Sequence, residues 1–357
     1  MKKTTIGVVT VARSDAGIYL PVLKAIKSHP SLRLKLIVAA THLSSEFGMT
    51  YKYLEEQGFE LNEKIEMTMS TDTPEGLAKS MGLGLISFGQ LFGKSKPDVL
   101  VVLGDRFEML SAVSAAMPFI IPVAHLHGGE ASEGAFDESI RHSITKMSHL
   151  HFVTTKQYYD RVVQLGEEPW RVTLSGAPSL DSIKSIKLWS KHQLEKKIGL
   201  SLDEKTLLVT LHPVTFEYKN TDHHIKSLFN ALRKLKMQVV FTFPNADTAG
   251  RIIIEKIKDF VSENNWASSV VNFGQQGYFT MLKYAVAMVG NSSSGIIESA
   301  SFKIPVLNIG NRQRGRIHSY NVVNVDYDQE LILKEIRRIT SDQFVESLKS
   351  IKNPYDH

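Results

Sequence analysis

The chain of 357 residues contains no cysteine. This absence excludes disulfides, thiolate metal sites and cysteine nucleophiles, so any chemistry must rest on oxygen and nitrogen groups. The sequence also lacks an uninterrupted apolar run near the roughly 18 residues that span a bilayer. Its amino-terminal apolar run is short and passes directly into Arg13 and Asp15, which favours a first β-strand over an export signal. We therefore expect a soluble, cytoplasmic protein with no membrane partner.

Basic residues outnumber acidic ones, and the formal net charge is +5. The densest basic stretch, residues 184–197 (KSIKLWSKHQLEKK), carries spaced lysines rather than arginines interleaved with aromatic residues. Such spacing is typical of a solvated helix and not of a nucleic-acid-binding surface. We predict no nucleic-acid partner and interpret the excess charge as suited to an anionic small ligand.

Hydrophobic residues make up 43% of a chain longer than the about 250 to 300 residues at which single cores stop growing. Short Val/Ile/Leu-rich runs alternate with helix-length amphipathic segments, which predicts an α/β fold with buried parallel strands. A lysine-rich joint between Gly176 and Lys205 separates two such series. We therefore predict two Rossmann-like domains, residues 1–180 and 181–357, facing each other across a cleft. The candidate strands are residues 6–11, 34–40, 99–103, 122–125, 151–154, 207–211, 239–243, 270–273, 286–289 and 306–309, and the candidate helices include residues 17–28, 75–92, 222–235 and 295–301.

Three acidic side chains stand at expected strand ends or helix starts. Asp105 follows the apolar run VLVVLG, Glu130 follows PVAHLHGG, and Asp137 opens the amphipathic segment FDESIRH. The carboxyl ends of parallel strands face the ligand crevice in such folds. Carboxylates gathered there repel one another, so one can hold its proton while another accepts one. The three residues are therefore candidates for acid/base chemistry at a neutral carbon or hydroxyl.

Helix capping is the alternative explanation for two of the three carboxylates. Asp105 can cap the helix that follows it, and Asp137 can favour the positive end of its own helix. Glu130 is harder to explain as a cap because Gly128 and Gly129 precede it. Paired glycines let the backbone approach a ligand closely, and a cap does not need them.

The second half of the chain offers an anion site. Residues 289–295 (VGNSSSG) follow an apolar strand and precede a helical run, so backbone N–H groups and serine hydroxyls can seat a phosphate. A plain N-cap is the alternative. Arginines in IGNRQRGR follow the next strand and can bind diphosphate oxygens in a forked geometry, while a glutamate one turn into the helix can accept hydrogen bonds from ribose hydroxyls. The predicted nucleotide-site residues are Asn291, Ser292, Ser293, Glu298 and Arg312, with Phe273 and Tyr278 either lining the base or packed in the core.

Further candidate contacts follow the first strands of each series. Arg13 and Asp15 follow the first strand, His42 follows the second, and His212 closes the first strand of the second series. The first βα turn is a frequent ligand contact in this fold class. It is not a dinucleotide fingerprint, because VARSDAG lacks the GxGxxG spacing.

A metal site is not predicted. His125 and His127 lie near Glu130, but histidines two apart on a strand without a clear third ligand are more often packed or hydrogen-bonded.

Taken together and in order, these motifs resemble the hydrolysing UDP-N-acetylglucosamine 2-epimerases of sialic-acid precursor pathways. The resemblance covers nearly the whole chain and implies a glycosyltransferase-B fold, with the active site between two Rossmann-like domains. HGGE followed by FDESIRH is similar to the hydrolysing branch of the family. The terminal NPYDH resembles a point inside the family pattern, so we expect a final crossover helix to be missing. The resemblance is carried by Arg13, His42, GDRFEM, HLHGGE, FDESIRHSITKMSHLHF, GNSSSGIIE and IGNRQRGR.

The resemblance implies a reaction without a cofactor. The proton at sugar carbon 2 is removed, UDP leaves carbon 1, and a 2-acetamidoglucal forms. Water then adds, and protonation of the opposite face gives N-acetylmannosamine. The two steps have opposite proton demands, which explains the need for several carboxylates.

The resemblance also assigns roles and partners. Asp137 and Arg141 lie one helical turn apart, which suits a base or a structural ion pair equally.

We expect a UDP-sugar substrate, a UDP product and a homo-oligomer, either a dimer or a tetramer. A UDP-2,4-diacetamido sugar of legionaminic-acid pathways is an open alternative substrate; a glycosyltransferase of the same fold and a non-catalytic sensor are alternative functions. The implied acid/base set is Asp105, Glu130 and Asp137; the groups orienting sugar and diphosphate are Arg13, His42, Arg141 and His212; and the UDP-holding residues are Ser292, Ser293, Glu298 and Arg312.

Overall fold

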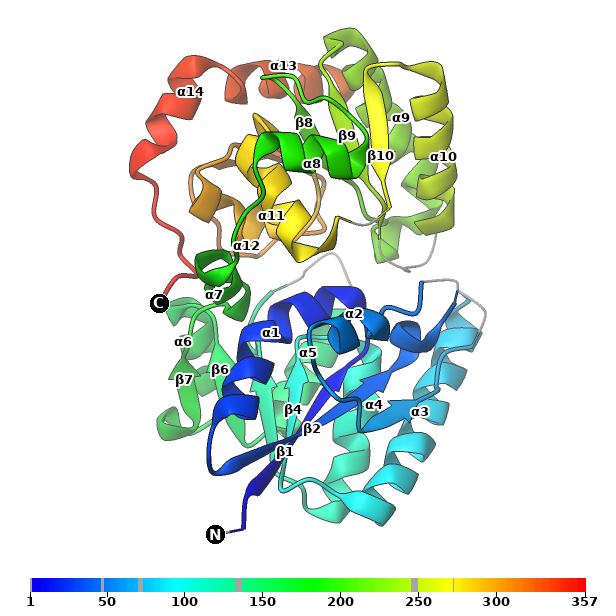
Figure 1. The fold of residues 1–357 in the computed structure, drawn as a ribbon, viewed down its shortest axis with the longest axis vertical. Helices are drawn as coiled ribbons and strands as arrows, with labels where there is room; N and C mark the ends of the chain where they lie inside the picture. The colour runs from blue at the N-terminus through cyan, green and yellow to red at the C-terminus, as the bar shows by residue number, and fades with distance from the viewer. Residues whose placement is uncertain (1, 46–47, 70–72, 132–136, 245–249, 272) are drawn as a thin grey trace. The chain divides into compact units, whose positions relative to one another are not determined.

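The computed structural model describes residues 2–45, 48–69, 73–131, 137–244, 250–271 and 273–357. The chain divides into two compact units, each built on its own sheet (Figure 1). Unit 1 comprises Met1–Glu130, Phe136–Ser182 and Tyr355–His357, and unit 2 comprises Ala131–Ala135 and Ile183–Pro354. The last three residues of the chain therefore belong with the first unit.

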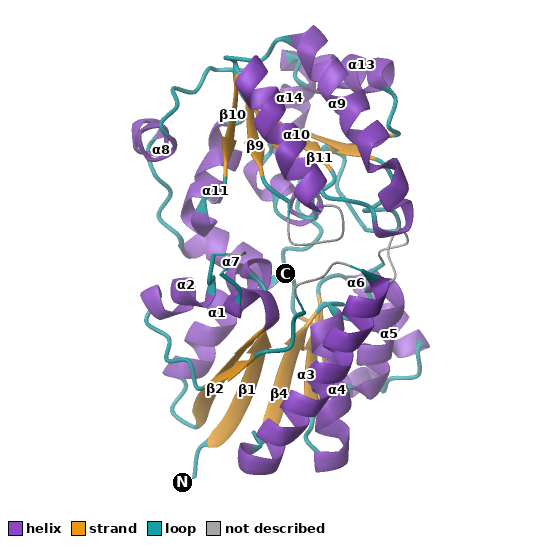
Figure 2. Ribbon diagram, turned by 90° about the vertical axis from the view of Figure 1, so that its right-hand side faces the viewer, coloured by secondary structure: helices purple, strands orange, loops and turns teal. Residues whose placement is uncertain are grey.

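Unit 1 contains a seven-stranded sheet in the order β3-β2-β1-β4-β5-β6-β7, in which every neighbouring pair of the described strands is parallel. Helices α3, α4 and α5 lie side by side on one face, and α1 covers the other (Figure 2). The strands are β1 Thr4–Thr10, β2 Leu32–Ala39, β3 Glu63–Ile65, β4 Val99–Leu103, β5 Val123–Leu126, β6 Leu150–Val153 and β7 Val172–Leu174. The helices are α1 Arg13–Ser28, α2 Tyr51–Glu56, α3 Pro74–Ser95, α4 Phe107–Ala116, α5 Asp137–Met147, α6 Lys156–Gln164 and α7 Pro178–Ser185.

Unit 2 contains a six-stranded sheet in the order β10-β9-β8-β11-β12-β13, again parallel between all described neighbours. Its strands are β8 Leu207–Thr210, β9 Val239–Thr242, β10 Ala267–Val270, β11 Ala287–Gly290, β12 Val306–Ile309 and β13 Val322–Val325. Its helices are α8 Lys191–Ile198, α9 Thr221–Leu235, α10 Gly250–Glu263, α11 Gly274–Tyr284, α12 Ser294–Ile297, α13 Gln329–Ile339 and α14 Asp342–Ser347.

The central strands are apolar on both faces because helices cover both. Successive side chains point to opposite faces, and Leu100 and Val101 in β4 and Leu207 and Leu208 in β8 are all buried. Continuous Val/Leu runs are the pattern expected of doubly covered parallel strands. The two parallel sheets confirm the predicted α/β fold class.

Several predicted boundaries were wrong. Helix α1 begins at Arg13 rather than at residue 17, and β10 begins at Ala267, three residues before the predicted 270. The lysine-rich stretch is helical only at its two ends, in α7 and α8. Strands β3, β7 and β13 are absent from the prediction because they are short and polar or at the sheet edge.

Candidate active site

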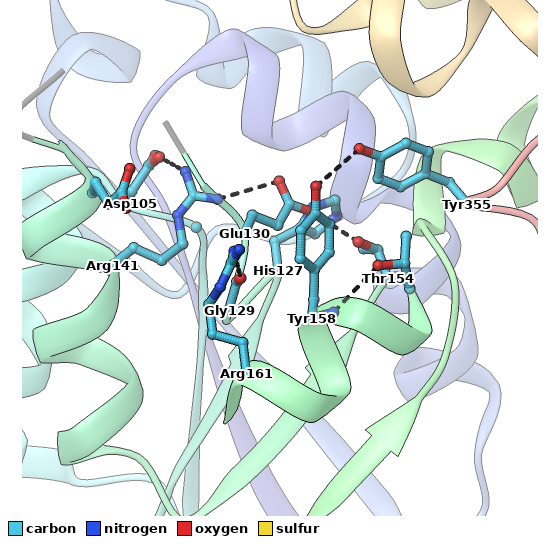
Figure 3. A network of polar contacts seen from close by, with 12 residues as sticks. Asp105, His127, Gly129, Glu130, Arg141, Thr154, Tyr158, Arg161 and Tyr355 are labelled. Atoms are coloured by element: carbon cyan, nitrogen blue, oxygen red, sulfur yellow. Dashed lines mark hydrogen bonds and ion pairs between the residues drawn. The ribbon is translucent and has the colours of Figure 1, made fainter. Parts of the chain in front are cut away.

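Two of the predicted carboxylates meet at the carboxyl end of the unit 1 sheet. Asp105 follows β4, Glu130 follows β5, and the guanidinium of Arg141 in α5 lies between them (Figure 3). Arg141 Nη2 pairs with Asp105 Oδ2, and Arg141 Nη1 lies 3.2 Å from Glu130 Oε2. The Arg141 side chain is 1% exposed. A buried cation of this size needs paired anions, and this pairing holds the carboxylates in fixed positions.

Glu130 is held by more than Arg141. Its Oε1 accepts a hydrogen bond from Thr154 Oγ1 at 3.0 Å and lies 2.7 Å from His127 Nδ1. The Glu130 side chain is 1% exposed. A carboxylate so enclosed is oriented by its neighbours, which favours a positioning role over direct contact with a substrate.

Packing explains the glycine pair before Glu130. Gly129 has a φ of +75°, and a Cβ there would lie 2.6 Å from the carbonyl oxygen of Tyr158 in α6. Arg161 Nη1 donates to the Gly129 carbonyl oxygen at 2.5 Å. A Cβ on Gly128 would lie 3.1 Å from His125 Nδ1. The structure therefore corrects the interpretation that these glycines admit a ligand, because they admit protein atoms instead.

Asp137 is the first residue of α5 and is half-buried. Residues 132–136, which precede it, lie outside the described residues. Its catalytic role remains a prediction.

The first βα turn is stabilised by Asp15. Asp15 Oδ2 accepts hydrogen bonds from the backbone N–H groups of Val11 at 3.0 Å and Ala12 at 3.1 Å. Burial raises the pKa of Asp15, although the charge of Arg106 and these hydrogen bonds lower it. Asp15 therefore caps α1, and its contact with substrate stays a prediction. Arg13, its neighbour at the start of α1, is partly exposed.

His42 is fully buried with both ring nitrogens engaged. Nε2 lies 2.9 Å from Thr10 Oγ1, and Nδ1 lies 2.8 Å from Thr50 Oγ1. Burial, followed by the charge of Arg106, lowers the pKa of His42 to about 4, so the ring is neutral at pH 7. These contacts give His42 a structural role, and its sugar-orienting role stays a prediction.

Sequence reasoning missed Arg106, the residue after Asp105. Its Nη2 lies 2.8 Å from Glu108 Oε1, and its charge also acts on Asp15 and His42. The signal was present in GDRFEM, where an arginine adjoins a candidate catalytic carboxylate.

The nearby histidine His125 is structural. Its Nε2 lies 2.7 Å from the Gly104 carbonyl oxygen, and its Nδ1 lies 3.2 Å from Thr145 Oγ1. Burial lowers its pKa to about 3, although the Gly104 hydrogen bond raises it. Among the described residues, no group of His, Asp and Glu side chains is placed to hold a metal ion.

In unit 2, Asn291 joins two strand ends. Its Oδ1 accepts from the backbone N–H of His212 at 2.7 Å, and its Nδ2 donates to the His212 carbonyl oxygen at 2.8 Å. The Asn291 carbonyl oxygen in turn accepts from Arg312 Nη1 at 3.2 Å and Gln313 Nε2 at 2.9 Å. Asn291 is fully buried and positions these strand ends, and its contact with substrate stays a prediction.

The predicted nucleotide residues gather beside Asn291. Ser292, Ser293 and Glu298 are half-buried around the short helix α12. Burial raises the pKa of Tyr278, with a contribution from the charge of Glu298, and the hydroxyls of Ser292 and Ser294 oppose this rise. The rings of Tyr278 and Phe273 meet edge to face at 6.5 Å. The structure thus brings serines, glutamate and aromatic rings together in unit 2.

Sequence reasoning also missed Tyr327, which supports this region. Its ring stacks on His224 at 3.6 Å, and its hydroxyl accepts from Asn291 Nδ2 at 3.4 Å. Burial raises the pKa of Tyr327 to about 12.

No helix in the described part of the chain has the length and apolar character to cross a membrane.

Comparison with known proteins assigns the family. The family model described as UDP-N-acetylglucosamine 2-epimerase matches residues 24–357. The chain belongs to the UDP-N-acetylglucosamine 2-epimerase family. Within this epimerase family, it is 42% identical over 326 residues to a GDP/UDP-N,N'-diacetylbacillosamine 2-epimerase (hydrolyzing) of Campylobacter jejuni, covering 91% of this chain and 85% of the relative. It is 36% identical over 349 residues to the polysialic acid biosynthesis protein P7 of Escherichia coli, covering 97% and 89%.

The fold of this epimerase-family chain is also found in a crystal structure. A UDP-GlcNAc 2-epimerase from Neisseria meningitidis, bound to UDP-GlcNAc, matches with a TM-score of 0.83 at 18% identity, covering 99% of this chain and 96% of that one. At this identity the likeness concerns the fold, and it agrees with the glycosyltransferase-B type expected from the sequence.

Proposed function

We propose that this protein hydrolyses a UDP-2-acetamido sugar with inversion at carbon 2. A base removes the carbon 2 proton while UDP leaves carbon 1, giving a 2-acetamidoglucal. Water then adds its oxygen to carbon 1, and a proton enters carbon 2 from the opposite face. The products are a free sugar and UDP.

The buried chain of charges in unit 1 carries this proposal. Asp105, Arg141 and Glu130 are linked at the carboxyl ends of β4 and β5, where α/β folds bind their ligands. Acid/base catalysis needs groups held in fixed geometry, and each such group supplies about 100-fold to 10,000-fold in rate.

We assign UDP to unit 2. The serine hydroxyls of Ser292 and Ser293 suit phosphate oxygens, and Glu298 suits ribose hydroxyls. Arg312, anchored on the Asn291 carbonyl oxygen, would stabilise negative charge as the diphosphate leaves.

The substrate we favour is a UDP-2,4-diacetamido sugar. The sequence motifs favour UDP-N-acetylglucosamine, but the relative with 42% identity is named for N,N'-diacetylbacillosamine. UDP-N-acetylglucosamine is kept as the second candidate, because the relative with 36% identity is named for polysialic acid biosynthesis.

A substrate competition tests this proposal. Purified protein would be given UDP-N,N'-diacetylbacillosamine and UDP-N-acetylglucosamine separately and as an equimolar mixture, and free UDP would be measured by ion-exchange chromatography. We expect UDP release without an added acceptor, with a kcat/KM at least about tenfold higher for the diacetamido sugar, a difference of about 1.4 kcal/mol. Preference for UDP-N-acetylglucosamine would reverse the substrate assignment. Release only with an acceptor sugar would indicate a glycosyltransferase, and binding without turnover would indicate a sensor.

A further inference from the structure

His127, which holds Glu130 in the network described above, also has the geometry of a proton-transfer group. It directly follows β5 and is 6% exposed. Its Nδ1 lies 2.7 Å from Glu130 Oε1. Its backbone φ is +62°, a left-handed conformation that is rare for a residue with a side chain. Such a conformation costs free energy, and although Lys236 and Lys303 adopt it as helix C-caps, His127 adopts it at a strand end beside the carboxylate network.

The partners of His127 define its tautomer. Glu130 also binds the guanidinium of Arg141 and the hydroxyl of Thr154, both of which donate. An ionised carboxylate only accepts hydrogen bonds, so His127 Nδ1 must carry the proton that lies between the two residues. A ring that carries this single proton has its free electron pair on Nε2.

Nε2 of His127 is enclosed and has no hydrogen-bond partner within the described residues. The nearby buried histidine His125 differs, since its Nε2 lies 2.7 Å from the Gly104 carbonyl oxygen, whereas His151 on β6 also leaves one ring nitrogen, Nδ1, without a partner among the described residues. A buried acceptor left without a donor is costly unless a ligand or water supplies the donor. An oriented general base is a histidine whose one ring nitrogen is hydrogen-bonded to a carboxylate while the other has a free electron pair. His127 has this arrangement.

We propose that His127 is a base of the reaction and that Glu130 is its positioning residue; this inference rests on the proposed function. In the elimination step, the electron pair of Nε2 forms a bond to the carbon 2 proton. The two electrons of the carbon 2–hydrogen bond form the carbon 1–carbon 2 double bond. The two electrons of the carbon 1–oxygen bond leave with UDP. The resulting imidazolium is stabilised by the negative charge of Glu130, which keeps its own protonation state. This assignment moves the acid/base role predicted for Glu130 to its neighbour.

Substitutions separate this role from a structural one. His127→Gln removes the base while keeping a polar side chain, and we expect kcat to fall about 100-fold or more with KM changed less than about threefold. His149→Gln is the matched control, because His149 is an exposed histidine before β6, and we expect its kcat within about twofold of wild type. UDP binding by calorimetry should be unchanged in both variants, since the assigned UDP residues lie in unit 2.

Glu130→Gln tests the positioning role through the tautomer itself. An amide can donate to His127 Nδ1, which would move the ring proton to Nε2 and remove the base. Nitrogen-15 NMR of histidine-labelled protein should show the His127 proton on Nδ1 in the wild type and on Nε2 in Glu130→Gln, with kcat reduced about as much as in His127→Gln.

The outcomes distinguish a failure of the proposed function from a failure of the His127 assignment alone. If the wild type releases no UDP from either sugar nucleotide, the proposed function fails, and a wild-type proton on Nε2 would independently overturn the His127 assignment. If the wild type is active and His127→Gln keeps kcat within about tenfold of it, only the His127 assignment is overturned.

Discussion

Replacing Arg141 with methionine should destabilise unit 1 far more than the loss of an ordinary ion pair. The guanidinium is 1% exposed and lies between Asp105 and Glu130. Methionine fills a similar volume but leaves the enclosed Glu130 carboxylate without its cation. Breaking a buried pair from one side costs about 3 to 5 kcal/mol.

Calorimetry of Arg141→Met and Arg233→Met would measure this cost. Arg233 pairs with Glu263 in unit 2, where the side chains are 45% and 60% exposed, so its replacement should cost under about 1 kcal/mol. For a unit of this size, about 3 to 5 kcal/mol corresponds to a fall in Tm of roughly 6 to 20 °C. Adding Glu130→Gln to Arg141→Met removes the unpaired charge. The double variant should therefore lose less free energy of unfolding than the two single variants lose together. Equal Tm shifts for Arg141→Met and Arg233→Met would refute the buried network.

Three further predictions follow from individual residues. Asp137→Asn should cut turnover about 100-fold while UDP affinity measured by calorimetry stays within about twofold; wild-type turnover would remove it from the acid/base set. Asn291→Ala leaves the N–H and carbonyl groups of His212 without their partner and should cost about 2 to 3 kcal/mol in urea unfolding and weaken UDP binding, whereas a loss under about 0.5 kcal/mol would contradict its joining role. The native pKa of His125, about 3, lies below the unfolded value of 6.5, so its stabilisation is present above pH 6.5 and is lost as the pH falls towards 3. Between pH 7.5 and 5.5 this loss is about 1.4 kcal/mol, and in urea titrations the free energy of unfolding of His125→Asn should fall by about 1.4 kcal/mol less over this pH range than that of the wild type.

The sequence predicted the parts of the fold whose signals are local and strong. β4 was placed at its observed bounds because its unbroken apolar run, VLVVL, marks a central strand. β12 was also placed at its observed bounds, although Asn308 interrupts its apolar run. β3 and β7 were missed because three residues such as EKI or VTL become a strand only through pairing with a neighbour. Pairing partners far apart in sequence leave no local pattern.

The candidate site was predictable at the level of residue types and not of contacts. Asp105 and Glu130 were found because both follow strands. Their link through Arg141 depends on where α5 packs, which local sequence does not define. The role proposed for His127 depends on a left-handed backbone turn and on the direction of one ring nitrogen, and neither is visible before the chain is folded.

The most direct test of the proposed chemistry is turnover in heavy water followed by proton NMR. With UDP-N,N'-diacetylbacillosamine as substrate, we predict free UDP and a free sugar, inverted at carbon 2 and carrying one deuterium there. A product that retains hydrogen at carbon 2, or a sugar still joined to UDP, would contradict hydrolytic epimerisation.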